Sequence, residues 1–96
     1  MLVYPAAWGP GPRKEDHWKT LARARAIENT FYVAAVSQGP GIGTGGSLIV
    51  DPMGVTLAGL GEVSGVAIAN IERERIASVR AVNPCLMNRR FAVTVA

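Results

Sequence analysis

The chain has 96 residues, a formal net charge of +3, 49% hydrophobic residues and one cysteine. That length fits one small domain or a piece of a larger one, and the apolar content excludes intrinsic disorder. No apolar run approaches the roughly 18 residues that a membrane-spanning helix needs. We therefore expect a protein that is not inserted in a membrane. Because a single cysteine cannot form an internal disulfide, we also expect a cytoplasmic protein.

Basic and acidic residues are interspersed along the chain, as in the run Glu72-Arg73-Glu74-Arg75. A nucleic-acid-binding surface gathers its basic residues and interleaves them with exposed aromatics. Alternating charges are instead typical of an ordinary solvated surface. We therefore expect no nucleic-acid partner.

The first predicted elements are a strand, a loop and a helix. Residues 2–4 are apolar and predict a buried strand that ends at Pro5, because proline donates no ladder hydrogen bond. Glycine and proline alternate over residues 9–12, which predicts a loop. Asp16 is a candidate cap for a helix over residues 17–29, which hold neither glycine nor proline.

The predicted helix over residues 17–29 has apolar side chains on more than one side. Such a helix is normally covered on more than one side, and its small alanines allow close approach of a second helix. Arg25 and Glu28 are one helical turn apart, so we expect them to pair on the covered face.

Three strands are predicted in the middle of the chain. Residues 31–36 are continuously apolar, which is typical of a strand covered on both faces. A glycine-rich loop over residues 39–46 leads to a strand at 47–50. The run Asp51-Pro52-Met53-Gly54 is a type I turn signature and predicts a hairpin to a strand at 55–58.

The last third of the chain is predicted to hold one helix. Residues 61–65 turn into an apolar segment, residues 66–71. A charged helix follows over residues 72–82 and ends before Pro84, because proline disfavours the helical state of the preceding residue. The tail is apolar at its end.

The run Gly41-Ile42-Gly43-Thr44-Gly45-Gly46 matches the spacing of a dinucleotide-binding loop. Such a loop must open a helix whose N-terminus holds the pyrophosphate, whereas here a strand is predicted to follow. The run also lacks the lysine of a phosphate-binding loop. We therefore interpret it as a hairpin loop.

Candidate catalytic and metal-binding residues are few. Cys85 follows a proline in an apolar context, which favours a small buried hydrophobe over a nucleophile. The single histidine, His17, stands beside Trp18 and is interpreted as a packing or hydrogen-bonding residue. Because the cysteine and histidine count cannot supply a metal site by itself, we predict no metal and no cofactor.

Several segments together resemble the carbon–nitrogen hydrolase (nitrilase) superfamily, and the resemblance covers nearly the whole chain. Within the superfamily it is closest to the amidase branch that includes omega-amidase-like proteins. The segments occur in the family's order and are Tyr4-Pro5-Ala6-Ala7-Trp8, His17 to Asn29, Tyr32 to Ala35, Gly46 to Gly54, Glu74 to Arg80, and Asn83 to Arg90.

The resemblance implies a hydrolase of non-peptide C–N bonds, with amides favoured over nitriles as small-molecule substrates. The family uses a Glu as general base, a Lys that stabilises the tetrahedral intermediate, and a Cys that attacks the carbon. In the family all three lie N-terminal to the segment where this sequence begins, and Cys85 is not at the nucleophile's position. No triad residue can be assigned here, so we expect residues 1–96 alone to be inactive.

The resemblance also implies a fold, namely the C-terminal part of an αββα sandwich that is incomplete in this chain. The family commonly dimerises through helices in this region, so we expect a homo-oligomer formed through the helix at 17–29 and the C-terminal tail. Trp8 follows the first strand and could line the acyl pocket of the substrate; the alternative is that it packs between sheets.

Two further interpretations remain open at this point. The chain could be a non-catalytic module for interaction or dimerisation, or a truncated gene relic. Strands without their neighbours expose unpaired edges and apolar faces, so we predict poor solubility for residues 1–96 alone.

Overall fold

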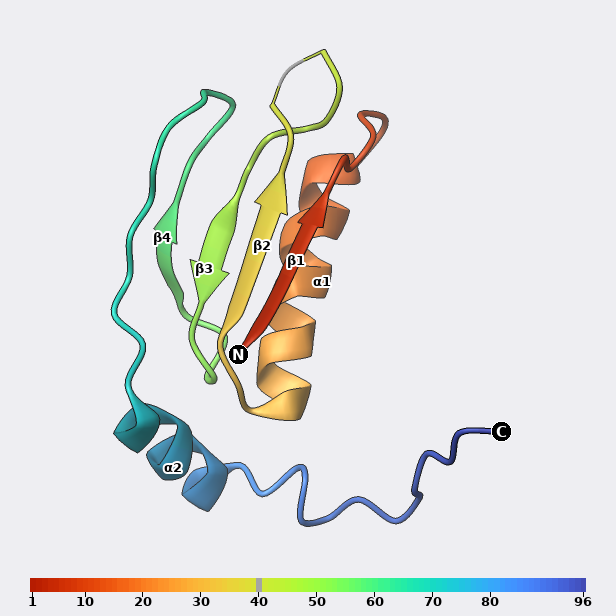
Figure 1. Ribbon diagram of the computed structural model, residues 1–96, viewed down its shortest axis with the longest axis vertical. Helices are drawn as coiled ribbons and strands as arrows, with labels where there is room; N and C mark the ends of the chain where they lie inside the picture. Colours follow the sequence, from red (N-terminus) through yellow and green to blue (C-terminus); the bar gives the residue numbers. More distant parts are fainter. Residues whose placement is uncertain (40) are drawn as a thin grey trace.

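A computed structural model describes residues 1–39 and 41–96. The protein has a mixed α/β fold, in which one helix lies against a four-stranded sheet and a second helix sits beyond one end of the strands (Figure 1). In chain order the elements are β1 (Leu2–Ala6), α1 (Lys14–Asn29), β2 (Val33–Ser37), β3 (Leu48–Val50), β4 (Thr56–Gly59) and α2 (Arg73–Val82).

The strands lie in the sheet in the order in which they occur in the chain. β1 and β2 are parallel and are connected through α1, whereas β2–β3 and β3–β4 are antiparallel. The predicted hairpin is confirmed, since the Gly54 N–H donates to the Asp51 carbonyl at 2.9 Å and closes the turn between β3 and β4. Gly54 has a φ of 85°, which glycine adopts without strain.

The prediction that the first strand ends at Pro5 is wrong, because β1 continues to Ala6. The Leu2 N–H donates to the Tyr32 carbonyl, and the Ala6 carbonyl accepts from Gln38, so the even-numbered backbone groups of β1 face β2. Pro5 is odd-numbered, and its missing donor therefore lies on the outer edge. Proline is tolerated in a strand at such a position.

Helix α1 begins at Lys14, earlier than predicted, and Asp16 is not its cap. The residue before the helix is Arg13, which has a φ of 59°. Asp16 lies in the first turn, where its carboxylate accepts from the Arg13 guanidinium at 2.8 Å. An acidic residue in the first turn also interacts favourably with the helix dipole.

The core lies between α1 and one face of the sheet. Trp18, Ala22 and Ala26 follow each other at intervals of four residues, so they form one stripe of α1. They pack on the face of the sheet that carries Val33 and Val50, both of which are fully buried. The small alanines let the helix lie close to the strands.

The opposite face of the sheet, here called the open face, is apolar but uncovered by any helix in the described residues (Figure 1). Its central row consists of Val3, Ala34, Ile49 and Ala58, which are paired with one another across the four strands. Beside that row, Val36 is 47% exposed. Within this chain the strand at 31–36 is thus covered by a helix on one face only, and cover of its second face stays a prediction for a longer protein.

The outer side of α1 faces solvent in this chain. Arg25 and Glu28 form the predicted ion pair, and within this single chain their side chains are about half exposed; cover of the pair by a second helix stays a prediction. The apolar side chains of Leu21 and Ile27 are also exposed on α1.

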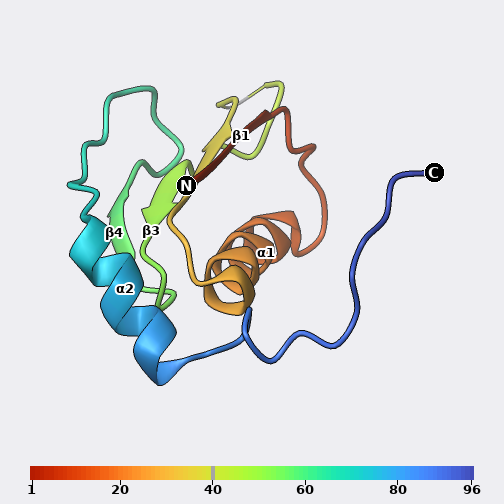
Figure 2. The ribbon, with the colours of Figure 1, turned by 60° about the horizontal axis from the view of Figure 1, so that its bottom comes forward.

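The segment after β4 has no regular secondary structure over residues 60–71, so the apolar segment at 66–71 forms neither strand nor helix. Helix α2 is confirmed and is followed by Asn83 and Pro84. The tail extends away from the rest of the molecule (Figure 2). Neither helix in the described part of the chain is long and apolar enough to cross a membrane.

Candidate functional site

The open face of the sheet forms the floor of a groove with a volume of about 420 Å³. Ala34 and Val36 of β2 and Ile49 of β3 form part of this floor, and the segment after β4 contributes Leu60 and Val66. Among the described residues that line the groove, the polar side chains are those of Ser37, Ser47 and Ser64. With no carboxylate, imidazole or thiol in this lining, the groove can hold an apolar group but offers no acid, base or strong nucleophile.

A glycine-rich loop forms one end of the groove and connects β2 to β3. The Gly45 N–H donates to the Gln38 carbonyl at 2.9 Å, and the Gly46 N–H donates to the Gly61 carbonyl at 2.9 Å. At Gly43 a Cβ atom would lie 2.4 Å from the Gln38 carbonyl oxygen, so a side chain there would force the backbone to move. These contacts make the glycines structural.

The interpretation of this glycine-rich run as a hairpin loop is confirmed. The element that follows it is β3, which is antiparallel to β2, and no helix opens at its end. Its glycine N–H groups donate to carbonyls of the chain itself, as described for Gly45 and Gly46. One residue of the predicted loop, Pro40, lies outside the described residues.

Trp8, the candidate pocket residue, lies in an aromatic cluster on the α1 side of the sheet. Its ring centroid is 5.5 Å from that of Trp18, which also meets Tyr4 edge to face at 5.6 Å. The Trp8 indole N–H donates to the Lys14 carbonyl at 2.7 Å, and the Lys14 ammonium lies 5.3 Å from the Trp8 ring centroid. Trp8 is therefore held by α1 and does not line the groove on the open face.

The aromatic cluster also fixes the glycine-rich loop. The Thr44 N–H donates to the Trp8 carbonyl at 2.9 Å, and the Trp18 indole N–H donates to the Gly46 carbonyl at 3.0 Å. Burial raises the pKa of Tyr4, and the nearby Arg25 charge partly offsets this effect. The cluster thus connects β1, α1 and the loop that ends the groove.

Cys85 and His17 are not brought together. Cys85 is exposed beyond the end of α2, so the prediction that it is a small buried hydrophobe is wrong. His17 is exposed in the first half of α1. In residues 1–39 and 41–96, no group of three or more His, Cys, Asp or Glu side chains could hold a metal ion.

Sequence reasoning expected exposed apolar strand faces but could not identify the residues that form the open face. The continuous apolar run at 31–36 indicated that both faces of that strand need cover, but the row across the sheet depends on register. Ala34 pairs with Val3 on one side and with Ile49 on the other. That pairing joins residues far apart in the chain, which hydrophobic periodicity along one strand cannot locate.

Comparisons with known proteins identify the relatives of this chain. A sequence model described as carbon-nitrogen hydrolase matches residues 1–81. The chain is 47% identical over 92 residues to a deaminated glutathione amidase of Escherichia coli O157:H7, an alignment that covers 96% of this chain and 35% of the relative. It is also 47% identical over 92 residues to the putative protein YbeM of Escherichia coli K12, covering 96% of this chain and 49% of YbeM.

A solved structure has the same fold over nearly all of the chain. The crystal structure of Saccharomyces cerevisiae Nit3, a member of branch 10 of the nitrilase superfamily, aligns with a TM-score of 0.82 and 34% identity. The alignment covers 93% of this chain and 34% of the yeast protein. The chain thus spans between about a third and a half of the length of these relatives.

Proposed function

Since the chain belongs to the carbon–nitrogen hydrolase family, we propose that it is the C-terminal portion of an amidase of that family. The complete enzyme hydrolyses a non-peptide C–N bond through an acyl-thioester on a cysteine. An amide substrate is favoured over a nitrile because several similar relatives bear the name deaminated glutathione amidase. The amidase branch with omega-amidase-like proteins, which the sequence resembles, agrees with that choice.

The observation that carries this proposal is the uncovered apolar face of the sheet. Val3, Ala34, Ile49 and Ala58 form a continuous row that meets no covering layer in the described chain. A sheet with apolar side chains on both faces is stable when both faces are covered. The chain also spans only 35% of the amidase from E. coli O157:H7. In the complete αββα sandwich, a second sheet from the rest of the protein would cover this face.

The proposed role of this portion is structural support for a site whose triad lies elsewhere. Among the described residues that line the groove there is no titratable side chain, and Cys85 lies on the exposed tail. In the family the Glu, Lys and Cys precede the matched segment, which is why we place this portion at the C-terminal end.

Trp8 remains the proposed contact to the acyl part of a small amide substrate. It follows β1, whose neighbour β2 is parallel, so both strands end at the same edge of the sheet. Its ring is half-buried and held by Trp18 and Lys14, which would present it as a rigid wall. The contacts to α1 equally support a packing role, and a Trp8→Phe variant of the complete enzyme would separate the two by a change in KM for acyl chains of different length.

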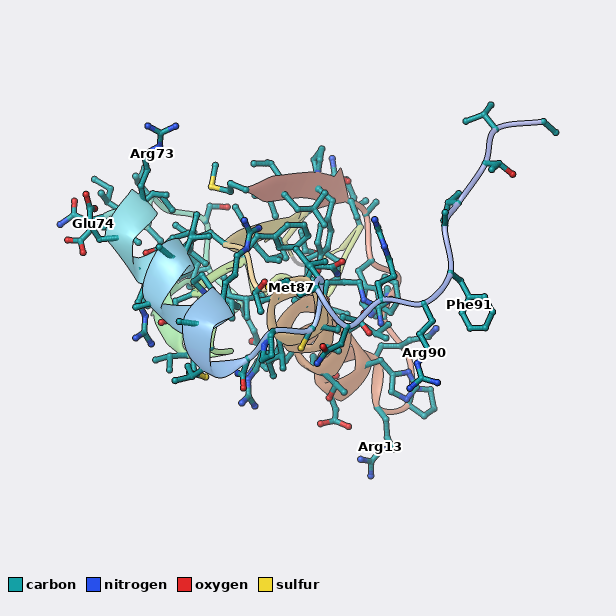
Figure 3. All side chains as sticks on the ribbon, turned by 90° about the horizontal axis from the view of Figure 1, so that it is seen from below. Arg13, Arg73, Glu74, Met87, Arg90 and Phe91 are labelled. Atoms are coloured by element: carbon teal, nitrogen blue, oxygen red, sulfur yellow. The ribbon has the colours of Figure 1, made fainter. Side chains whose placement is uncertain are left out.

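We further propose that the protein self-associates in the cytoplasm through α1 and the tail. Leu21 and Ile27 are exposed on α1, and Phe91, Val93 and Val95 are almost fully exposed in the tail. Phe91 projects away from the body of the molecule (Figure 3). Gel filtration tests this proposal: a monomer at all concentrations would contradict it.

Fragment complementation tests the proposed function. We would express residues 1–96 with the part of the E. coli amidase that the alignment leaves uncovered, and measure ammonia release from small amides. We expect no turnover by either part alone and measurable turnover by the pair. Turnover by residues 1–96 alone that is lost in Cys85→Ala would contradict the proposal, as would an inactive pair that nevertheless forms a folded complex.

A matched pair of variants identifies the surface involved. Val36→Asp places a charge on the open face, and Val82→Asp places the same charge on α2, where the side chain is 66% exposed. Burying an unpaired carboxylate between two layers is costly, so Val36→Asp should abolish complementation. Val82→Asp should leave complementation intact. If Val36→Asp restored activity as well as Val82→Asp does, the open face would not be the contact surface.

A further inference from the structure

Helix α2 lies where two turns of the fold come together, at one end of the sheet (Figures 1 and 2). The first turn connects α1 to β2 and contributes Thr30 and Tyr32. The Tyr32 hydroxyl accepts from the Glu72 N–H at 3.3 Å, and the Thr30 hydroxyl accepts from the Arg80 guanidinium at 3.2 Å. These two contacts hold both ends of α2 to the first turn.

The second turn connects β3 to β4 and contributes Asp51 and Met53. The Arg75 guanidinium donates to one oxygen of the Asp51 carboxylate through two nitrogens, at 2.9 and 2.8 Å. The Asn83 side-chain amide donates to the Met53 sulfur at 3.3 Å. α2 thus bridges the two turns largely through polar contacts, with Val79 as its buried apolar residue.

Asp51 also makes hydrogen bonds that are separate from its contact with α2. Its other carboxylate oxygen accepts from the backbone N–H groups of Met53 at 2.8 Å and Val55 at 2.9 Å. The Asp51 side chain is 6% exposed, whereas that of Arg75 is 39% exposed. One carboxylate therefore closes the β3–β4 turn from within and holds a helix from outside.

The connection between β4 and α2 is a segment without regular secondary structure. Residues 60–71 have no regular secondary structure, so α2 can leave its position without breaking the pairing of β4 with β3. We propose that α2 is a releasable clasp. The Asp51–Arg75 ion pair holds it across the two turns, and loss of that pair frees α2 and the following tail while the sheet and α1 stay folded.

The electrostatic surroundings of Asp51 support this role. Arg75 faces the carboxylate from α2, and Arg23 of α1 donates to the Gly54 carbonyl in the same turn at 2.9 Å. Burial raises the pKa of Asp51, but the hydrogen bonds from Val55, Arg75 and Met53 together outweigh burial and hold the pKa below its usual value. The carboxylate is consequently charged at neutral pH and available to Arg75.

Hydrogen exchange of the full chain tests the clasp. Arg75→Met removes the ion pair and leaves the two backbone contacts of Asp51 in place. We expect the amides of residues 73–82 to exchange at least roughly tenfold faster in this variant, with those of α1 and β2 unchanged. Arg73→Met is the matched control, since Arg73 lies on the same helix and points away from the body of the molecule (Figure 3), and it should change neither set.

A second variant keeps the test decisive if Arg75→Met unfolds the chain. Asp51→Asn removes the charge but retains a carbonyl oxygen for the Met53 and Val55 N–H groups. The same selective loss of protection in α2 supports the clasp. The proposal is overturned if α2 keeps its protection in a folded variant, if α2, α1 and β2 lose protection together in both variants, or if α2 is already unprotected in the unsubstituted chain.

Discussion

The two faces of the sheet carry similar side chains in different surroundings. On β2, Val33 faces α1 and is fully buried, whereas Val36 points to the open face and is 47% exposed. Both positions are valine, so the difference in burial comes from the layer above each one. The apolar composition of a strand therefore indicates where cover is required, and the rest of the protein determines whether that cover is present.

Of the substitutions considered, replacing Trp18, which packs between α1 and the sheet, should have the largest effect on the free energy of unfolding. Trp18 is 4% exposed, packs against Tyr4 and Trp8, and donates to the Gly46 carbonyl. We expect Trp18→Ala to lower the free energy of unfolding by about 3–5 kcal/mol, because a large buried side chain leaves a cavity. Urea titration followed by circular dichroism measures this, and a loss below about 1 kcal/mol would mean that α1 is not the principal cover.

The two valines of β2 provide a direct test of the difference between the faces. Val33→Ala should lower the free energy of unfolding by about 2 kcal/mol, since it removes buried methyl groups and leaves a cavity. Val36→Ala should lower it by less than about 0.5 kcal/mol in the chain alone. Equal losses would show that the open face is covered in solution, and repeating the titration at lower protein concentration would reveal whether a second copy covers it.

The pH dependence of stability tests the contribution of the Asp51 carboxylate, which is independent of the cover on either face of the sheet. Because the pKa of Asp51 is lower in the folded protein than the ordinary value of 3.8, its carboxylate contributes stability above that value. The contribution is lost as the pH falls through the folded-state pKa. At neutral pH we expect Asp51→Asn to be less stable than the unsubstituted chain by about 1.5 kcal/mol, a typical contribution of a charged hydrogen bond.

The measurement is a set of urea titrations between neutral and strongly acidic pH. The difference between the two proteins should close in the acid range, because the protonated Asp51 side chain is then uncharged, like the asparagine amide of the variant. A difference that stays constant at every pH would mean that the carboxylate's charge contributes nothing to stability.

Local patterns predicted much of the fold, and the failures occurred where long-range contacts decide. The type I turn at Asp51 and helix α2 depend on neighbouring residues and were confirmed. The prediction that Pro5 ends its strand was wrong. The position of Pro5 at a free edge is set by the pairing of β1 with β2, which the local sequence does not reveal. The burial of Cys85 was also predicted wrongly, since its apolar neighbours Leu86 and Met87 belong to a tail whose side chains are exposed.

The candidate site was predictable only through family resemblance. Nothing in the local sequence near Trp8 indicates whether its ring meets a ligand or a helix, and the structure places it against Trp18. The groove could not be predicted because its walls come from β2, β3 and the irregular segment after β4. Asp51 was recognised as a turn residue, but its partner Arg75 lies 24 positions along the chain on another element.

The outer side of α1 is a third apolar-rich surface, and here the smallest effect is expected. Arg25 and Glu28 form an ion pair with half-exposed side chains, so a double-mutant cycle with Arg25→Met and Glu28→Gln should give a coupling below about 0.5 kcal/mol. Dilute protein is the reference condition, because any partner covering α1 would desolvate the pair. A coupling energy that rises with protein concentration would place the pair in an interface between copies. A constant small value would exclude this side of α1 from that interface, and self-association would then have to involve the tail.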